Sequence, residues 1–167
     1  MKLAVVTRLF FILSWIVFGW MHTAGAEELP YVQDFTAEAK EARAKEVPIL
    51  ILFMNSNCGY CKRVLQEFLL PMGRNAEYNN KVIMRQVELG SNVKLRDFNG
   101  KLTTQGEFTR THNIQLVPTV ALFDAEGHVL ADPIVGLLTP DFYGGYLDNA
   151  IDEALAKVRS GQVVPRQ

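Results

Sequence analysis

A short apolar run that leads directly into a Cys-x-x-Cys sequence constrains this chain more than any other feature. Residues 48–54 read PILILFM, without helical spacing, which is typical of a β-strand buried on both faces. Small polar residues at 55–57 interrupt the run, and Cys58-Gly59-Tyr60-Cys61 follows. Residues 62–70 then place apolar side chains at helical spacing. The sequence therefore predicts that both cysteines lie where a buried strand passes into the N-terminus of a helix.

The start of a helix favours the reactive form of a cysteine. A thiol there faces unpaired backbone N–H groups and the positive end of the helix dipole, both of which stabilise a thiolate. Cys-x-x-Cys sites lower the thiol pKa from ~8.5 to roughly 3.5–7.5, and Lys62 and Arg63 add positive charge within a turn. We therefore predict that Cys58 is the attacking thiol and that Cys61 is the resolving thiol that releases a mixed disulfide.

Length and composition limit the class of protein. A chain of 167 residues with 49% hydrophobic residues can bury one core and is expected to form one domain. The two cysteines both belong to the motif, so the chain is not a small framework held by disulfides. The net charge is −1 and the sequence has no basic patch with interleaved aromatic residues, so we expect no nucleic-acid partner.

Residues 1–26 have the pattern of a signal peptide. Lys2 and Arg8 form a positively charged start, residues 9–20 are apolar, and residues 24–26 are a small-x-small cleavage site. We expect cleavage after this site, export to the periplasm of a bacterial envelope, and no stable membrane anchor afterwards. An uncleaved anchor is the alternative, although the apolar run is shorter than the ~20 residues that a spanning helix needs.

The remaining sequence alternates between helix and strand signals. We expect a linker at 27–33, one domain at 34–158 and a flexible tail at 159–167. Helices are expected at 34–46, 62–70, 104–111 and 139–158, strands at 48–54, 81–89, 116–123 and 128–131, and a loop or small hairpin at 90–106. This order predicts an α/β fold with a mixed central β-sheet and helices on both faces. The Cys pair then lies at the C-terminal edge of a central strand.

Two of the predicted helices carry more specific expectations. Pro71 and Gly73 are expected to break the helix that follows the Cys pair. Thr139-Pro140-Asp141 is a strong start signal for the last helix. The side chains of that helix expected to face the core are Phe142, Tyr146, Leu147, Ile151 and Leu155, and Tyr143 is expected to pack in the core with the other two aromatic residues.

Together these segments resemble the thioredoxin-fold thiol:disulfide oxidoreductases. The resemblance rests on residues 49–69 with the Cys pair, Val117-Pro118-Thr119 opening a strand, the turn at 123–127, and Val135-Gly136-Leu137 before a terminal helix. It implies a thioredoxin-like fold and disulfide exchange between the Cys pair and protein disulfide or dithiol substrates. No cofactor and no metal are implied.

The same resemblance assigns the residues around the Cys pair. It implies that Pro118 is cis and lies against the cysteines, with the Val117 backbone offering hydrogen bonds to a substrate chain. Gly59 and Tyr60, between the cysteines, are expected to contact the substrate as well, although Tyr60 has the alternative of only covering the site. Thioredoxins have a buried acid where this chain has Leu52, so the proton acceptor for Cys61 stays open, with water as the default.

A narrower resemblance concerns the segment before the Val-Pro-Thr strand. Residues 97–100, residues 102–103 and the helix leading to Asn113 resemble the exported SoxW-like thioredoxins. That resemblance implies recharging by a membrane electron-donor protein, and the Gly90–Thr104 segment is a candidate partner surface. The Gly-Tyr dipeptide is also similar to that of periplasmic disulfide isomerases, whose separate dimerisation domain does not fit a chain of this length.

Other readings of the Cys pair stay open at this point. The pair is compatible with a structural disulfide, although so short a loop stabilises a fold little. Zinc needs four ligands, and His112 and His128 lack metal-ligand spacing and are expected to be surface or capping residues. The rival functions are a disulfide donor or isomerase, and a peptide-binding module in which the cysteines are incidental.

Overall fold

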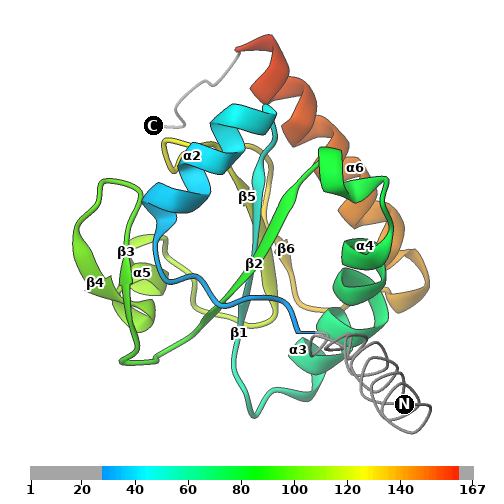
Figure 1. Cartoon of the computed structure of the whole chain (residues 1–167). Helices are drawn as coiled ribbons and strands as arrows, with labels where there is room; N and C mark the ends of the chain where they lie inside the picture. Colours follow the sequence, from blue (N-terminus) through cyan, green and yellow to red (C-terminus); the bar gives the residue numbers. More distant parts are fainter. Residues whose placement is uncertain (1–27, 162–167) are drawn as a thin grey trace, which may run out of the picture.

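A four-stranded mixed sheet organises the computed structural model, which describes residues 28–161 (Figure 1). The strand order is β2-β1-β5-β6, with β1 and β2 parallel and the other neighbours antiparallel. The strands of this sheet are β1 (Ile49–Met54), β2 (Ile83–Glu88), β5 (Thr119–Phe123) and β6 (Ile134–Val135). The predicted signal peptide and the last six residues of the predicted tail lie outside the described residues.

Helices cover both faces of the sheet, as predicted (Figure 1). The helical elements are α2 (Phe35–Lys45), α3 (Gly59–Arg63), a π-helix (Val64–Leu69), α4 (Leu70–Arg74), a 3₁₀ turn (Tyr78–Asn80), α5 (Gln105–Thr111) and α6 (Pro140–Ser160). Helices α2 and α5 pack on one face, whereas α3, the π-helix, α4 and most of α6 pack on the other. Of the loop or small hairpin expected at 90–106, the structure has the hairpin, formed by β3 (Lys94–Arg96) and β4 (Leu102–Thr104).

Strand β1 is the centre of the hydrophobic core. All six of its side chains are buried, and they alternate between the two faces of the sheet. Leu50, Leu52 and Met54 join the cluster under α6, whereas the odd-numbered residues join the cluster under α2. The prediction of a strand buried on both faces is confirmed.

The helix after the Cys pair continues past the expected break. We predicted that Pro71 and Gly73 end this helix, and that prediction is wrong, because α4 extends to Arg74. The reason lies in the π-helix, where the N–H of Leu70 donates to the carbonyl of Leu65, five residues earlier. Pro71 therefore falls in the first turn of a new helical register, where a missing N–H costs no intrahelical bond.

Helix α6 turns a different face to the core from the one predicted at its start. Phe142 and Tyr146 were expected to point inward, but they are 67% and 48% exposed. The core packing expected for Tyr143 is confirmed: it is buried and packs against Phe68, with ring centroids 4.9 Å apart. The inward placement of Leu147, Ile151 and Leu155 is confirmed. Small Ala150 and Ala154 complete the buried face and let the helix approach the sheet.

Two segments differ in detail from the predicted strand and linker. Residues 128–131 return beside β5, as predicted: the Asp124 N–H donates to the His128 carbonyl at 2.9 Å, and the Leu130 N–H donates to the Leu122 carbonyl at 2.8 Å, around an antiparallel bridge between Phe123 and Val129. The Asp124 carboxylate accepts the N–H groups of Glu126 and His128 and stabilises the turn, and β6 pairs with the earlier part of β5. The expected linker is packed: Leu29 and Val32 are buried, and the Val32 N–H donates to the Gln86 carbonyl at 3.1 Å. Within residues 28–161, none of the helices is long and apolar enough to cross a bilayer.

The turn after β5 generates a stability prediction. Gly127 has φ +86, and a Cβ there would lie 2.7 Å from Cδ2 of Phe98. We expect Gly127→Ala to lower the free energy of unfolding by about 2–4 kcal/mol, because strain and overpacking add. Gly145→Ala is the matched control. It lies on an exposed turn of α6 with nothing near its Cβ position, so it should stabilise by about 0.5–1 kcal/mol. Urea unfolding of both variants measures the difference, and equal effects would contradict it.

His112 generates a prediction about pH. It ends α5 between the rings of Phe108 and Phe123, and burial there lowers its pKa below the ordinary value, against an opposing effect of the Asp97 charge. The folded protein therefore holds the neutral imidazole at pH values where the unfolded chain is already protonated. The stability that this gives is fully present above pH ~6.5 and is lost as the pH falls toward the folded pKa.

We accordingly expect the free energy of unfolding to fall between pH 7 and pH 5, and to fall less in His112→Phe. Urea unfolding at several pH values measures both slopes. Carboxylates titrate in both proteins, so the difference between the slopes isolates His112. Identical slopes would show that His112 is not responsible.

Candidate active site

The Cys pair lies where β1 passes into α3. A three-residue loop, residues 55–57, connects them and folds on itself: the Cys58 N–H donates to the Asn55 carbonyl at 2.9 Å, and the Asn57 N–H donates to the Asn55 side-chain oxygen at 2.9 Å. Cys58 has an extended backbone and is the N-cap residue of α3. The predicted placement at the start of a helix is confirmed.

The helix start directs a backbone donor at one sulfur. Cys58 and Cys61 form a disulfide, and the N–H of Cys61 donates to Sγ of Cys58 at 3.1 Å. Cys58 is half-buried, whereas Cys61 is fully buried in an apolar cluster with Val64 and Leu65. In the reduced protein, the same N–H is placed to stabilise a thiolate on Cys58. Burial among apolar side chains favours the neutral thiol at Cys61.

The two basic residues after the pair contribute unequally. Arg63 makes two hydrogen bonds to the Glu67 carboxylate, at 2.8 and 3.0 Å, and Glu67 thereby offsets its charge. The same pairing, first through its hydrogen bond, holds the pKa of Glu67 below the ordinary value. Lys62 is exposed on the first turns of the helix. Because the Arg63 charge is offset and Lys62 is exposed to solvent, we attribute most of the positive potential at Cys58 to the helix terminus.

The loop before β5 lies against the Cys pair. The Val117–Pro118 peptide bond is cis, and the Val117 carbonyl oxygen is 3.9 Å from Sγ of Cys58. Pro118 is buried, and its carbonyl accepts the N–H of Gly136 at 2.7 Å, which ties the loop to the segment after β6. Residues 59 positions apart in the chain therefore meet at the sulfurs.

The remaining predicted site residues lie at the same edge of the molecule. Gly59 and Tyr60 form the first turn of α3 between the cysteines; both are exposed, Tyr60 by 62%. Leu52 is fully buried and faces the cluster that contains Cys61. The position of the acid found in thioredoxins is thus apolar here, and water stays the expected proton acceptor for Cys61.

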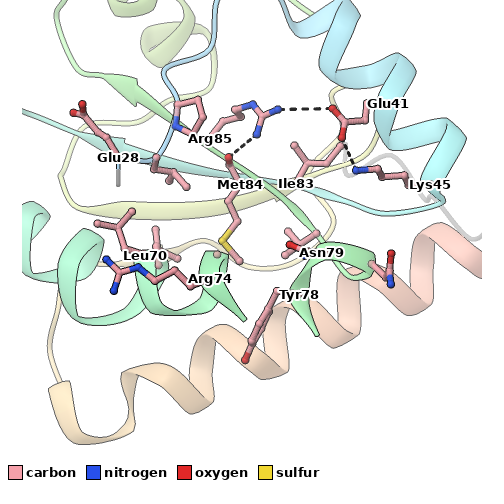
Figure 2. Close-up of a pocket in the computed structure, with 16 residues that line it drawn as sticks. Glu28, Glu41, Lys45, Leu70, Arg74, Tyr78, Asn79, Ile83, Met84 and Arg85 are labelled. Carbon is pink, nitrogen blue, oxygen red and sulfur yellow. Dashed lines mark hydrogen bonds and ion pairs between the residues drawn. The ribbon is translucent and has the colours of Figure 1, made fainter. Parts of the chain in front are cut away.

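A hollow of the described structure lies away from the Cys pair. It has a volume of about 570 Å³ and lies beside β2, between α2 and α4 (Figure 2). The Gln86 N–H donates to the Pro30 carbonyl, but Pro30 has no N–H to continue this pairing along β2. The Met84 carbonyl accepts from the Arg85 guanidinium at 2.9 Å instead. The hollow therefore follows from the end of strand pairing and is not part of the Cys site.

Sequence reasoning missed two residues that support the site. Gly136 was noted only as part of a resemblance, and Glu88 was not considered, although its carboxylate accepts an N–H of the loop before Cys58. Glu88 is the last residue of β2, so it lies at the same edge of the sheet as the end of β1. An acid at the end of the second predicted strand was the available signal.

Comparisons with known proteins were made for family, sequence and structure. A family model described as "Thioredoxin-like domain" matches residues 35–151. A comparison with curated proteins finds no match.

Solved structures similar to this chain include two thioredoxins and one protein described as an oxidoreductase. Thioredoxin O2 from Arabidopsis thaliana is 18% identical over 74% of this chain and 94% of its own, with a TM-score of 0.48. Mitochondrial thioredoxin 3 from Saccharomyces cerevisiae is 17% identical over 72% and 94%, with a TM-score of 0.46. A protein described as DsbH oxidoreductase is 20% identical over 80% and 93%, with a TM-score of 0.48.

The geometry at Cys58 generates a prediction about its acidity. In Cys61→Ser, Cys58 is the single thiol, and we expect its pKa to lie below the ordinary ~8.5, because the N–H of residue 61 and the helix terminus favour the thiolate. The rate of alkylation by iodoacetamide as a function of pH measures this pKa. Lys62→Gln in the same background should raise the pKa only slightly, because exposed charges are screened. A pKa of 8.5 or above would contradict the assignment of Cys58 as the attacking thiol.

Proposed function

This chain belongs to the thioredoxin-like domain family, and from that membership and the geometry of its Cys pair we propose that it is a thiol:disulfide oxidoreductase that acts on proteins. The observation that carries the proposal is the contact between the Cys61 N–H and Sγ of Cys58 at the start of α3. It gives the more accessible sulfur a donor that stabilises negative charge. A buried partner sulfur lies close enough to close the disulfide.

The reaction proceeds in two exchanges when it runs in the reducing direction. The Cys58 thiolate attacks one sulfur of a substrate disulfide and forms a mixed disulfide, and the other substrate sulfur leaves as a thiolate and takes a proton from water. Cys61 then loses its proton to water and attacks Sγ of Cys58. The Cys58–Cys61 disulfide forms, and the second substrate sulfur leaves. Two electrons pass from the protein to the substrate, and the exchange needs no bound cofactor or metal.

Four further residues are proposed to contact the substrate. The Val117 backbone lies beside Sγ of Cys58, where an extended substrate chain can hydrogen-bond to it while its cysteine reacts. Pro118 follows Val117 and is buried, so it supports the Val117 backbone from the side of the core. Gly59 offers no side chain to obstruct the approach, and exposed Tyr60 presents an aromatic surface beside the sulfurs.

We further propose export and a membrane partner. The signal-peptide pattern of residues 1–26 supports a periplasmic protein, and disulfide exchange suits that oxidising compartment. The resemblance of residues 97–113 to SoxW-like exported thioredoxins supports recharging by a membrane electron-donor protein. These assignments rest on sequence patterns alone.

A disulfide donor or isomerase is the second candidate, favoured by the Gly-Tyr dipeptide between the cysteines. The same residues would carry it, with the electrons moving in the opposite direction or returning to the same substrate. Equilibration of the Cys pair with glutathione buffers separates the candidates. A reductant has a potential near that of thioredoxin, about −270 mV, whereas a donor is more oxidising, toward about −120 mV.

Trapping of substrates tests the proposed function. The full-length precursor with Cys61→Ser, expressed with residues 1–26 intact, should accumulate mixed disulfides through Cys58, because the sulfur that releases them is absent. Non-reducing gels and mass spectrometry identify the trapped proteins. The matched control Cys58→Ser should trap far fewer, because Cys61 is buried.

Turnover separates this function from a binding module. The wild type should accelerate the reduction of insulin disulfides by dithiothreitol, and Cys58→Ser should reduce the rate to that of dithiothreitol alone, because the attacking thiol is gone. A peptide-binding module with incidental cysteines would keep its partner in this variant. Absence of trapping by Cys61→Ser together with absence of turnover by the wild type would overturn the oxidoreductase proposal.

A further inference from the structure

Glu88 holds the loop that carries Cys58. Its Oε1 accepts the N–H of Ser56 at 3.1 Å, and the two residues are 32 positions apart in the chain. The N–H groups of the next two loop residues are used within the loop, by the Asn55 side chain and the Asn55 carbonyl. The N–H group of Ser56 is thus the one of these three that bonds outside the loop. Through it, the Glu88 carboxylate links the loop to the neighbouring strand β2.

The backbone of Glu88 is held in place by its neighbours. Glu88 is the last residue of β2 and pairs in register with Met54, the last residue of β1. The N–H of Glu88 donates to Oε1 of Gln105 at 2.6 Å, and Gln105 is 2% exposed at the start of α5. The N–H of Leu89 donates to the Met54 carbonyl at 2.7 Å. The backbone of Glu88 is thus held by β1 on one side and by α5 on another, and its half-buried side chain projects from a rigid base.

The placement of the loop affects the chemistry of Cys58. The Cys61 N–H contacts Sγ of Cys58 only while Cys58 occupies the N-cap position, and the loop that ends at Cys58 sets that position. A carboxylate this close to the loop would by its charge alone disfavour a thiolate. An acid is therefore unexpected here unless its hydrogen bond to Ser56 matters more than its charge.

We propose that Glu88 is a positioning residue for Cys58, acting through the hydrogen bond that its side-chain oxygen accepts from Ser56 and not through its negative charge. The inference rests on the proposed thiol:disulfide exchange and deepens it. It also links the Cys loop, through Gln105, to the start of the helix that follows the β3–β4 hairpin.

In the full chain, two conservative substitutions of Glu88 separate the effect of side-chain length from the effect of side-chain charge. Glu88→Gln keeps the length of the side chain and an acceptor oxygen but loses the charge, whereas Glu88→Asp keeps the charge and is one methylene too short to reach Ser56. We expect Glu88→Asp to slow insulin reduction about tenfold, because a displaced nucleophile loses its alignment. Glu88→Gln should retain at least about half of the wild-type rate.

The pH profile of Cys58 provides a readout that a purely structural role would not change. In the Cys61→Ser background, Glu88→Asp should raise the pKa measured by alkylation, and Glu88→Gln should leave it equal or lower. Glu126→Gln is the control for loss of an exposed acid, since Glu126 lies in the turn after β5, at the opposite end of β1. Thermal unfolding confirms that each variant is folded under the assay conditions.

The outcomes distinguish this inference from the proposed function. Wild-type turnover tests the function, and the ratio of each Glu88 variant to the wild type tests the role of Glu88. Wild-type behaviour of Glu88→Asp would overturn the positioning role, as would Glu88→Gln impaired as strongly as Glu88→Asp. A Glu88→Asp variant with altered stability but an unchanged alkylation profile would also overturn it, because its effect would then be on folding.

Discussion

Burial of β1 on both faces determines where the sulfurs lie. Its six side chains alternate between two apolar clusters, and its backbone is paired on one edge with β2 and on the other with β5. A strand held in this way cannot shift along its axis without exposing a whole set of side chains. The loop that leaves its C-terminal end therefore starts from a fixed point, and the first turn of α3 receives Cys58 in a set orientation. The position of Cys58 therefore depends on how β1 packs in the core.

The two sulfurs differ because the elements around them differ. Cys58 lies at the N-cap, half-exposed, with a backbone donor and the Val117 carbonyl nearby, whereas Cys61 is one turn inside and surrounded by apolar side chains. The proposed division of roles between an accessible attacking sulfur and a buried resolving sulfur thus requires no further titratable group. This is consistent with Leu52 standing where thioredoxins have an acid. The family membership of the chain and the local geometry support the same chemistry.

Much of this arrangement is readable from the sequence because its signals are local. The apolar run of β1, the motif at the helix start and the helix expected at 104–111 involve residues within a few positions of each other, and all three are confirmed. The failures depend on packing and backbone geometry that no simple sequence pattern shows. Of the aromatic residues at the start of α6 only Tyr143 is buried, against Phe68, and Pro71 is accepted because a π-helix resets the register just before it. The contact of Glu88 with Ser56 spans 32 positions, and no periodic pattern in the sequence indicates it.

The interruption of pairing at Pro30 has a consequence for how this protein behaves among other chains. An outer strand with free backbone groups invites association with strands of other molecules. Here the lead-in segment covers β2 only around Gln86, and the next outward carbonyl, that of Met84, is already occupied by the guanidinium of Arg85. An incoming strand would have to displace a charged side chain that also pairs with Glu38 at 2.7 Å. Arg85 therefore disfavours edge-to-edge aggregation at the part of β2 that the lead-in segment leaves unpaired.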